Sequence, residues 1–228
     1  MRYGKTVYGR FIKRVNRFIA EVLIDGKKEP VHIKNTGRLK ELLLPDAEVL
    51  LEKSSNPNRK TAYSLVAVKK GDRWVNIDSL APNTVVYEAL HAGKLTEFPK
   101  LDVLKKEVTY GSSRMDIYWE SGEDRGLIEI KGVTLEQEGV AMFPDAPTKR
   151  GTKHVMELAS ACKNGYHAAI FFVIQMKGCH LFTPHKHMDP PFAEAVLQAH
   201  KNGVQVLAYD TIVSGNRLEL DLPVPVRL

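Results

Sequence analysis

Residues 103–133, "VLKKEVTYGSSRMDIYWESGEDRGLIEIKGV", predict three consecutive β-strands. Apolar, aromatic and β-branched residues recur in three runs, and "SGED" between the second and third run is typical of a tight turn. Side chains alternate along a strand, so Glu129 and Lys131 share one face of the third strand while Ile128 and Ile130 share the other. The face with the two charged residues is therefore either exposed to water or part of a site.

The segments that follow predict a sheet covered by helices. "KHVMELASACKNG" (153–165) has the apolar spacing of a helix, and the apolar run "HAAIFFVIQ" (167–175) predicts a strand covered on both faces. "DPPFAEAVLQAHKNG" (189–203), which begins with a good N-cap residue, predicts a second helix before the strand "VQVLAYD" (204–210). Prolines restrict the tail "NRLELDLPVPV" (216–226) to an edge strand. This order predicts a mixed-sheet α/β domain.

The first third of the chain has a different pattern. Short β-like runs are separated by turn signals such as Asp25-Gly26, while "NTGRLKELLLP" (35–45) has the spacing of one short helix. About five strands with one inserted helix fit an oligonucleotide-binding (OB) barrel. We therefore predict a two-domain protein of the α+β and α/β classes, with an OB-like β-barrel over 1–82 and the α/β domain over 83–228. Asn83 is expected to cap a short helix at the start of the second domain.

Composition excludes several classes of protein. No apolar run approaches the roughly 20 residues that span a bilayer, and the start of the chain lacks the apolar core of a signal peptide, so we expect a cytoplasmic protein without a membrane partner. Cys162 and Cys179 lack CxxC spacing, which argues against a zinc knuckle or a disulfide framework. Residues 1–82 contain 17 Lys and Arg against 9 Asp and Glu. This surplus suits a polyanion, although an ordinary basic surface would have it too.

The second strand gives the charged face of the third a chemical interpretation. If the two strands pair as an antiparallel hairpin, Asp116 lies on the same side as Glu129 and Lys131, whereas a slip of one residue would separate them. Hard cations such as Mg²⁺ prefer oxygen ligands, which Asp116, Glu129 and the carbonyl of Ile130 could supply. Lys131 would then lie beside metal-bound water and stabilise charge on a phosphate. The alternative is the solvated face of a half-exposed strand.

Several longer motifs resemble a known family. They are "NRFIAEV", "HIKNTGRLKELL", "EVTYGSSRMDI", "IEIKGVTL", "FPDAPTKRGTKHVMEL" and "DPPFAEAV", in this order over nearly the full length. Together they resemble the sugar fermentation stimulation protein (SfsA) family, and an acid followed by Glu-x-Lys on the next strand is similar to the PD-(D/E)xK motif of restriction-endonuclease-like cores. The resemblance implies an OB-like domain, then a restriction-endonuclease-like domain, nonspecific DNA binding and a link to sugar use. It assigns the motif positions to Asp116, Glu129 and Lys131, whereas Pro144-Asp145 follows Glu-x-Lys and does not match.

Basic residues in both domains are the predicted DNA contacts. "FPDAPTKRGTKH" (143–154) leads into a helix whose first turn, with free backbone amides, favours a phosphate, unless the segment is only a solvated basic loop. His32 is expected on the binding face of the barrel, or else as a partly buried strand histidine. The predicted nucleic-acid-binding residues are Arg10, Arg14, Arg17, His32, Arg38, Arg114, Thr148, Lys149, Arg150 and His154.

Two functional hypotheses follow. The first is a largely nonspecific DNA-binding protein with a Mg²⁺- or Mn²⁺-dependent nuclease site, in which Asp116, Glu129 and Lys131 are catalytic. The second is a non-catalytic DNA-binding regulator of sugar (maltose) metabolism genes that retains the nuclease fold. A carbohydrate-binding role has only the family name in its favour. The sequence leaves open whether the DNA is single- or double-stranded and whether the chain forms a homo-oligomer.

Overall fold

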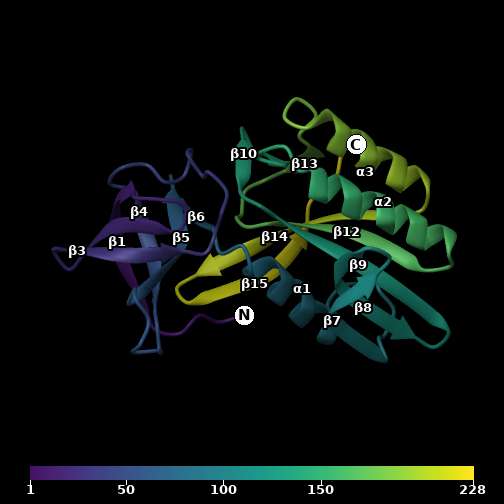
Figure 1. The fold of residues 1–228 in the computed structure, drawn as a ribbon, viewed down its shortest axis with the longest axis horizontal. Helices are drawn as coiled ribbons and strands as arrows, with labels where there is room; N and C mark the ends of the chain where they lie inside the picture. Colours follow the sequence, from purple (N-terminus) through teal and green to yellow (C-terminus); the bar gives the residue numbers. More distant parts are fainter.

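The computed structural model describes residues 1–228 and places two domains side by side (Figure 1). The first is a five-stranded barrel in the order β3-β2-β1-β4-β5, closed because β3 also pairs with β5. Its strands are β1 (Thr6–Arg14), β2 (Ile19–Ile24), β3 (Lys27–Ile33), β4 (Glu48–Lys53) and β5 (Tyr63–Lys70), and β6 (Arg73–Asn76) extends the sheet beyond β5. The predicted OB-like barrel is confirmed.

One connection in the barrel matches the prediction and one does not. Asp25 and Gly26 both have positive φ (47° and 77°) in the turn between β2 and β3, as a tight hairpin requires. The helix predicted over 35–45 is wrong, because this segment forms an irregular loop with a turn. Leu39 has a positive φ of 49°, which no helix allows, and it is buried at 2 % exposure. The apolar spacing therefore reflects burial of a loop rather than a helical face.

The second domain is built on a six-stranded mixed sheet in the order β15-β14-β12-β9-β8-β7. Its strands are β7 (Val103–Tyr110), β8 (Ser113–Ser121), β9 (Asp124–Val133), β12 (His167–Ile174), β14 (Gln205–Ser214) and β15 (Arg217–Pro223). The three predicted strands, β7, β8 and β9, form an antiparallel meander, while β12 is parallel to both β9 and β14. Among the strands of the sheet, β15 pairs with β14 alone and lies at the end of the strand order, which confirms the edge strand.

Helices cover both faces of this sheet, as Figure 1 shows. They are α1 (Ala81–His91), α2 (Lys149–Lys163) and α3 (Pro190–Lys201). In β9, Leu127 packs into the core beneath α2 and α3, whereas Ile128 and Ile130 pack with α1 on the other face. Glu129 and Lys131 therefore face α2. The predicted cap residue Asn83 lies inside α1, whose N-cap is Leu80, so that prediction is wrong.

A small third sheet joins the two domains and was not predicted. It consists of β10 (Leu135–Gln137), β11 (Val140–Phe143) and β13 (Leu181–Pro184), each too short for a clear alternating pattern. Glu136 in β10 is buried and accepts charge-assisted hydrogen bonds at 2.8 Å from both Lys70 and Arg73 of the barrel. This ion pair fixes the barrel against the second domain.

The first residues of the chain contact the second domain, although the predicted domain boundary between residues 82 and 83 assigned them to the barrel. Arg2 forms an isolated bridge with Arg217, the first residue of β15, and the Tyr3 amide donates to the carbonyl of Asn216. Residues 1–3 thus associate with the second domain before the chain enters the barrel. No helix in the structure has the length and apolar character needed to cross a bilayer.

Candidate metal and nucleic-acid site

The candidate site lies where β8 and β9 separate. Their ladder runs to the pair Ile117↔Ile128, and continuing this register by one residue places Asp116 opposite Glu129. Along β9, the next backbone amide that points toward β8 is that of Ile130. It donates to the side chain of Asp116 (N to Oδ2, 2.7 Å) and not to a backbone carbonyl of β8. The carboxylate thus takes the place of a backbone acceptor, and the two strands part at the site. The register on which the sequence prediction depended brings the acids together.

Asp116 is held by two hydrogen bonds. Besides the Ile130 amide, Asn83 Nδ2 donates to Asp116 Oδ1 at 2.7 Å. Burial raises the pKa of the Asp116 carboxyl, and the charge of Glu129 raises it further, while the Ile130 amide, Lys131 and Asn83 act in the opposite direction. The negative charge of Glu129 beside the Asp116 carboxyl makes this a place where a cation is favourable.

Glu129 has one satisfied oxygen and one free oxygen. Its side chain is buried, and Oε1 accepts from Lys131 Nζ and lies 2.6 Å from His154 Nδ1. Oε2 is buried as well and has no hydrogen-bond partner. An unpartnered buried carboxylate oxygen is unfavourable. Glu97 and Glu157 each have one as well, but that of Glu129 belongs to an acid beside a second candidate ligand, Asp116, and it therefore marks a site for a ligand.

The donor set fits a hard divalent cation. The N–H and C=O of one strand residue point to the same edge, so the Ile130 carbonyl faces Asp116, as its amide does. Two carboxylates and a carbonyl suit Mg²⁺, which completes its shell with water and substrate oxygens. No three His, Cys, Asp or Glu side chains gather as a metal cluster, so Asp116 and Glu129 are the side-chain carboxylates that this candidate site offers.

The first turns of α2 lie next to Asp116 and Glu129. Thr148 caps the helix through a bond from the Gly151 amide (3.0 Å), and Arg150 Nε donates to His154 Nε2 at 3.3 Å. Because Nε2 accepts that bond, Nδ1 carries the proton and donates to Glu129. His154 is 4 % exposed. It was predicted as a DNA contact, and the structure instead places it behind Glu129 as a support for that carboxylate.

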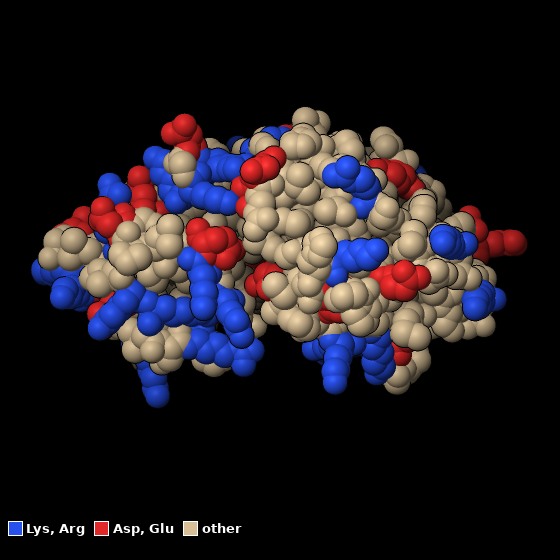
Figure 2. All heavy atoms as spheres, turned by 90° about the horizontal axis from the view of Figure 1, so that it is seen from above, with Lys and Arg blue, Asp and Glu red and all other residues tan.

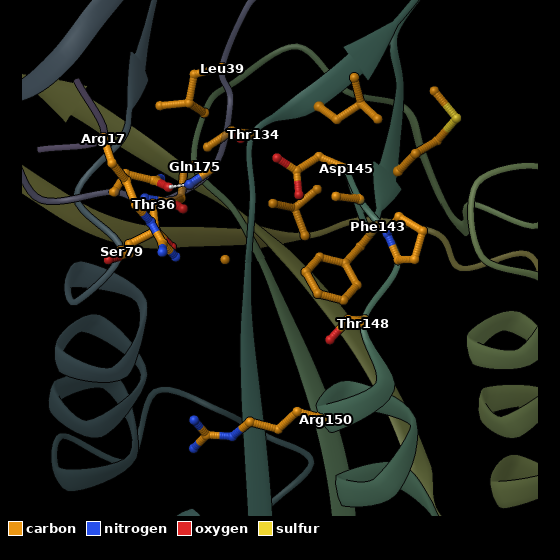
Figure 3. A pocket seen from close by; sticks show the side chains of 18 residues that line it. Arg17, Thr36, Leu39, Ser79, Thr134, Phe143, Asp145, Thr148, Arg150 and Gln175 are labelled. Atoms are coloured by element: carbon orange, nitrogen blue, oxygen red, sulfur yellow. Dashed lines mark hydrogen bonds between the residues drawn. The ribbon is translucent and has the colours of Figure 1, made fainter. Parts of the chain in front are cut away.

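A cavity of about 620 Å³ separates this turn from the barrel. Figure 3 shows Arg17 and Ser79 on one side of it, and Thr148 and Arg150 on the other, with the Arg150 guanidinium extended into the space. Gly132 and Val133, which directly follow Lys131, also line the cavity. We call this space the interdomain cleft. It leads from the barrel to the end of β9.

Among the predicted barrel contacts, Arg14 has a structural role. All of its N–H groups are directed at backbone carbonyls, including those of Asn35, Gly37 and Arg38 in the loop that replaces the predicted helix. The guanidinium organises this loop and has no N–H left for a phosphate, which argues against the predicted contact. Arg38 itself is exposed.

The other predicted contacts are spread over two domains. Arg10 is exposed and reaches the Asp46 carbonyl, Lys149 is exposed, and Arg114 forms a surface pair with Glu107 (3.5 Å). His32 is half-buried on β3. Figure 2 shows Lys and Arg gathered over the barrel half, in line with the basic surplus of residues 1–82. Of the residues predicted to bind DNA, Arg17, Thr148 and Arg150 share one cleft, whereas Arg10 and Arg114 lie outside it.

Two functional neighbours were missed by sequence reasoning. Asn83 binds Asp116 from a helix more than thirty positions upstream, for which no local pattern exists. The buried position of His154 did have a signal. Gly151, His154, Val155 and Leu158 follow the spacing of one helical face, and all are buried in α2.

Comparisons with known proteins agree with this architecture. The family model of the SfsA N-terminal OB domain matches residues 12–77, and that of the sugar fermentation stimulation protein RE domain matches residues 80–217. A sugar fermentation stimulation protein homolog of Alkaliphilus oremlandii is 53% identical over 232 residues (97% of this chain and 99% of that protein). A homolog of Clostridium novyi is 44% identical, with both chains covered completely.

A solved structure extends the likeness to the whole fold. It is that of Pyrococcus furiosus SfsA in complex with Ca²⁺, and it is similar with a TM-score of 0.91 and 27% sequence identity, covering 100% of this chain and 98% of that chain. The two family models together match most of the chain, and the curated relatives match it from end to end. This chain therefore belongs to the sugar fermentation stimulation protein (SfsA) family.

Proposed function

We propose that this protein is a DNA-binding phosphodiesterase whose nuclease site depends on a divalent cation, Mg²⁺ or Mn²⁺. The observation that carries the proposal is the convergence of Asp116, Glu129 and Lys131, with Glu129 Oε2 buried and unpartnered, next to a cleft that Arg17 and Arg150 line. The Pyrococcus furiosus SfsA structure is a complex with Ca²⁺, and this supports a hard cation in the family.

The residues of the site divide the chemistry among them. Asp116, Glu129 and the Ile130 carbonyl would hold the cation, which when bound would neutralise phosphate charge and lower the pKa of a coordinated water. Lys131, beside Glu129, is placed to orient the attacking water and stabilise negative charge on the phosphate oxygens. Arg150 projects into the cleft from the first turn of α2, where a phosphate oxygen would be held by its guanidinium and by free helix amides.

The basic barrel would supply most of the affinity, with little sequence preference. Contacts between Lys or Arg and phosphates release counterions, so the logarithm of the affinity should fall linearly with the logarithm of salt concentration. A flat salt dependence would contradict phosphate contacts as the source of binding.

A second candidate function has one observation in its favour. Lys131 already forms an ion pair with Glu129, and His154 donates a hydrogen bond to the same oxygen, so the charge of Glu129 is compensated without a cation. A DNA-binding regulator of sugar (maltose) genes that keeps the nuclease fold without using it is consistent with this arrangement. The free Oε2 of Glu129 favours the first proposal, because a scaffold that only binds DNA gains nothing from an unsatisfied buried carboxylate.

Cleavage assays separate the two functions. Single-stranded, linear duplex and supercoiled DNA are incubated with the protein in Mg²⁺, Mn²⁺ or EDTA. The Asp116→Asn and Lys131→Ala variants should lose metal-dependent cleavage but retain binding. Glu107→Gln, which alters an exposed acid outside the site, should cleave like the wild type. Absence of metal-dependent cleavage on every substrate would refute the nuclease and leave the regulator.

A further inference from the structure

An exposed aromatic pair lies on the barrel next to the interdomain cleft. Phe18, in the connection between β1 and β2, is 48% exposed. Its ring stacks on that of His32 from β3, with centroids 6.4 Å apart and an interplanar angle of 14°. Single exposed apolar side chains are common on protein surfaces, so the Phe18 ring is a candidate ligand contact only because of its stacked partner and its surroundings.

The backbone holds Phe18 in this exposed position. Asn16 Oδ1 accepts from the amides of Phe18 (2.9 Å) and Ile19 (3.0 Å), and the Phe18 carbonyl accepts from the Ile33 amide at 2.8 Å. The ring is therefore presented by a fixed loop and does not need to be ordered when a ligand binds. Such preorganisation lowers the entropic cost of binding.

The surroundings of the pair are cationic. The Arg17 guanidinium lies 5.7 Å from the centre of the Phe18 ring and has no carboxylate partner. Burial lowers the pKa of His32, and the charges of Arg59 and Lys34 lower it further, so the imidazole is a neutral stacking surface at neutral pH. Lys34 pairs with Glu52 and Asp78, whereas Arg17 and Arg59 form no salt bridge. Neutral rings with such unpaired cations beside them suit bases and their phosphates rather than an apolar protein surface.

Arg17 connects the pair to the candidate site. It contacts the Phe18 ring and also lines the interdomain cleft, opposite Thr148 and Arg150 (Figure 3). A strand with a base on Phe18 would have its backbone beside Arg17 and a continuous path along the cleft toward the end of β9. In an OB barrel, Phe18 belongs to the loop after the first strand and Arg59 to the loop between the fourth and fifth strands, both on the ligand-binding side of this fold.

We propose that Phe18 and His32 form a base-stacking platform for single-stranded DNA, whose backbone then passes Arg17 and enters the cleft. The substrate class is DNA with an unpaired segment, because the bases of an intact duplex are stacked on each other and cannot reach the platform. This inference rests on the proposed DNA-binding function and specifies its substrate. It does not require that cleavage occur.

The barrel offers a matched control. Tyr8 on β1 is 57% exposed and packs against Trp74 of β6 (5.8 Å), so it is also an exposed barrel aromatic in a ring pair. It does not line the cleft, and no Lys or Arg lies over its ring. Removal of Tyr8 therefore tests whether any exposed aromatic has the same effect.

The test is binding of labelled oligothymidylate and of a blunt duplex, measured by fluorescence anisotropy in EDTA. Phe18→Ala should weaken binding of the single strand by about 5- to 150-fold, which corresponds to loss of one stacked base, and should leave duplex binding within about twofold. Phe18→Trp should restore binding of the single strand. Tyr8→Ala should change neither, and thermal unfolding should show that both alanine variants remain folded.

The outcomes distinguish this inference from the nuclease proposal. Equal loss for single strand and duplex, no loss for either, or an equal effect of Tyr8→Ala would overturn the platform, as would failure of the wild type to bind the single strand. Because these measurements are made without metal, absence of cleavage would leave the platform standing. Metal-dependent cleavage of single strands that is unaffected by Phe18→Ala would refute the platform and leave the nuclease.

Discussion

Replacing Asp116 by asparagine removes one charge from the candidate site while preserving its shape. The Asp116 carboxylate accepts one hydrogen bond from the Ile130 amide and one from Asn83 Nδ2, each 2.7 Å long. In Asp116→Asn, the remaining carbonyl oxygen can accept from Ile130, and the new NH₂ can donate to Asn83. Asn83 has no other side-chain hydrogen bond, so its amide is free to turn and accept. The variant should therefore fold normally.

The direction of its effect on stability without metal follows from the pKa. Burial and the charge of Glu129 raise the folded-state pKa of Asp116, so the folded protein holds this proton more tightly than the unfolded chain. The contribution of Asp116 to stability is complete below the unfolded value of about 3.9 and is lost as pH rises through the folded value. In EDTA at neutral pH, Asp116→Asn should thus be at least as stable as the wild type, with the advantage disappearing in acid.

Metal should reverse this order. A cation at 100 times its Kd stabilises the folded state by about 2.7 kcal/mol. For a chain of this size, each kcal/mol corresponds to about 2–4 °C, so the wild-type Tm should rise by about 5–11 °C. If the loss of one acidic ligand weakens affinity about 100-fold, the same metal concentration adds only about 0.4 kcal/mol to the variant, or about 1–2 °C.

Thermal melts followed by circular dichroism in EDTA, Mg²⁺ and Mn²⁺ measure all of these quantities. Glu107→Gln controls for removal of an acid in general, because Glu107 lies exposed on β7 and pairs only with Arg114. Glu107→Gln should show the same metal-dependent rise in Tm as the wild type. Two results would refute the reasoning: a metal shift in Asp116→Asn equal to that of the wild type, or a loss of several kcal/mol by this variant in EDTA.

Two further predictions concern residues that support the site and the domain contact. His154→Ala should weaken metal binding by about 10- to 100-fold, measured by calorimetric titration, because Glu129 loses the donor that orients it. His154→Asn, whose amide can donate from near the Nδ1 position, should recover part of the loss; equal defects in both variants would indicate that the imidazole only fills space. Glu136→Gln should cost about 1.5–3 kcal/mol in urea unfolding, because the buried carboxylate loses its charge-assisted bonds while Lys70 and Arg73, each 31% exposed, remain partly solvated; a cost below about 0.5 kcal/mol would contradict the importance of these contacts.

The parts of the site that lie on strands could be predicted because strand geometry has a strict period of two. With "SGED" as the turn, the shared face of Asp116, Glu129 and Lys131 follows, and only the register remains to be established. Closure of the barrel follows similarly from its turns and short strands. These are local rules, and they apply wherever hydrogen bonding is regular.

Features that depend on contacts across the molecule could not be predicted in this way. Leu39 and Leu42 have a helical spacing, but the long side chain of Arg14 satisfies the carbonyls of their loop and makes an irregular backbone stable. The local sequence around Asn83 is that of a helix cap. It gives no sign of the actual partner of Asn83, because Asp116 is distant in sequence. In both cases a tertiary hydrogen bond overrides a local preference.

The association of residues 1–3 with the second domain has a mechanical consequence. The chain crosses from that domain into the barrel before β1 and returns after β6, so the barrel is inserted within the other domain and attached at two points. The same barrel is also held by the Glu136 ion pair and by the hydrogen bonds between Asn76 and Gln175, and these contacts resist rotation about the line through its two attachments. The separation of Arg17 and Arg150 is thereby set by the fold, and a strand would meet a cleft whose width is already established.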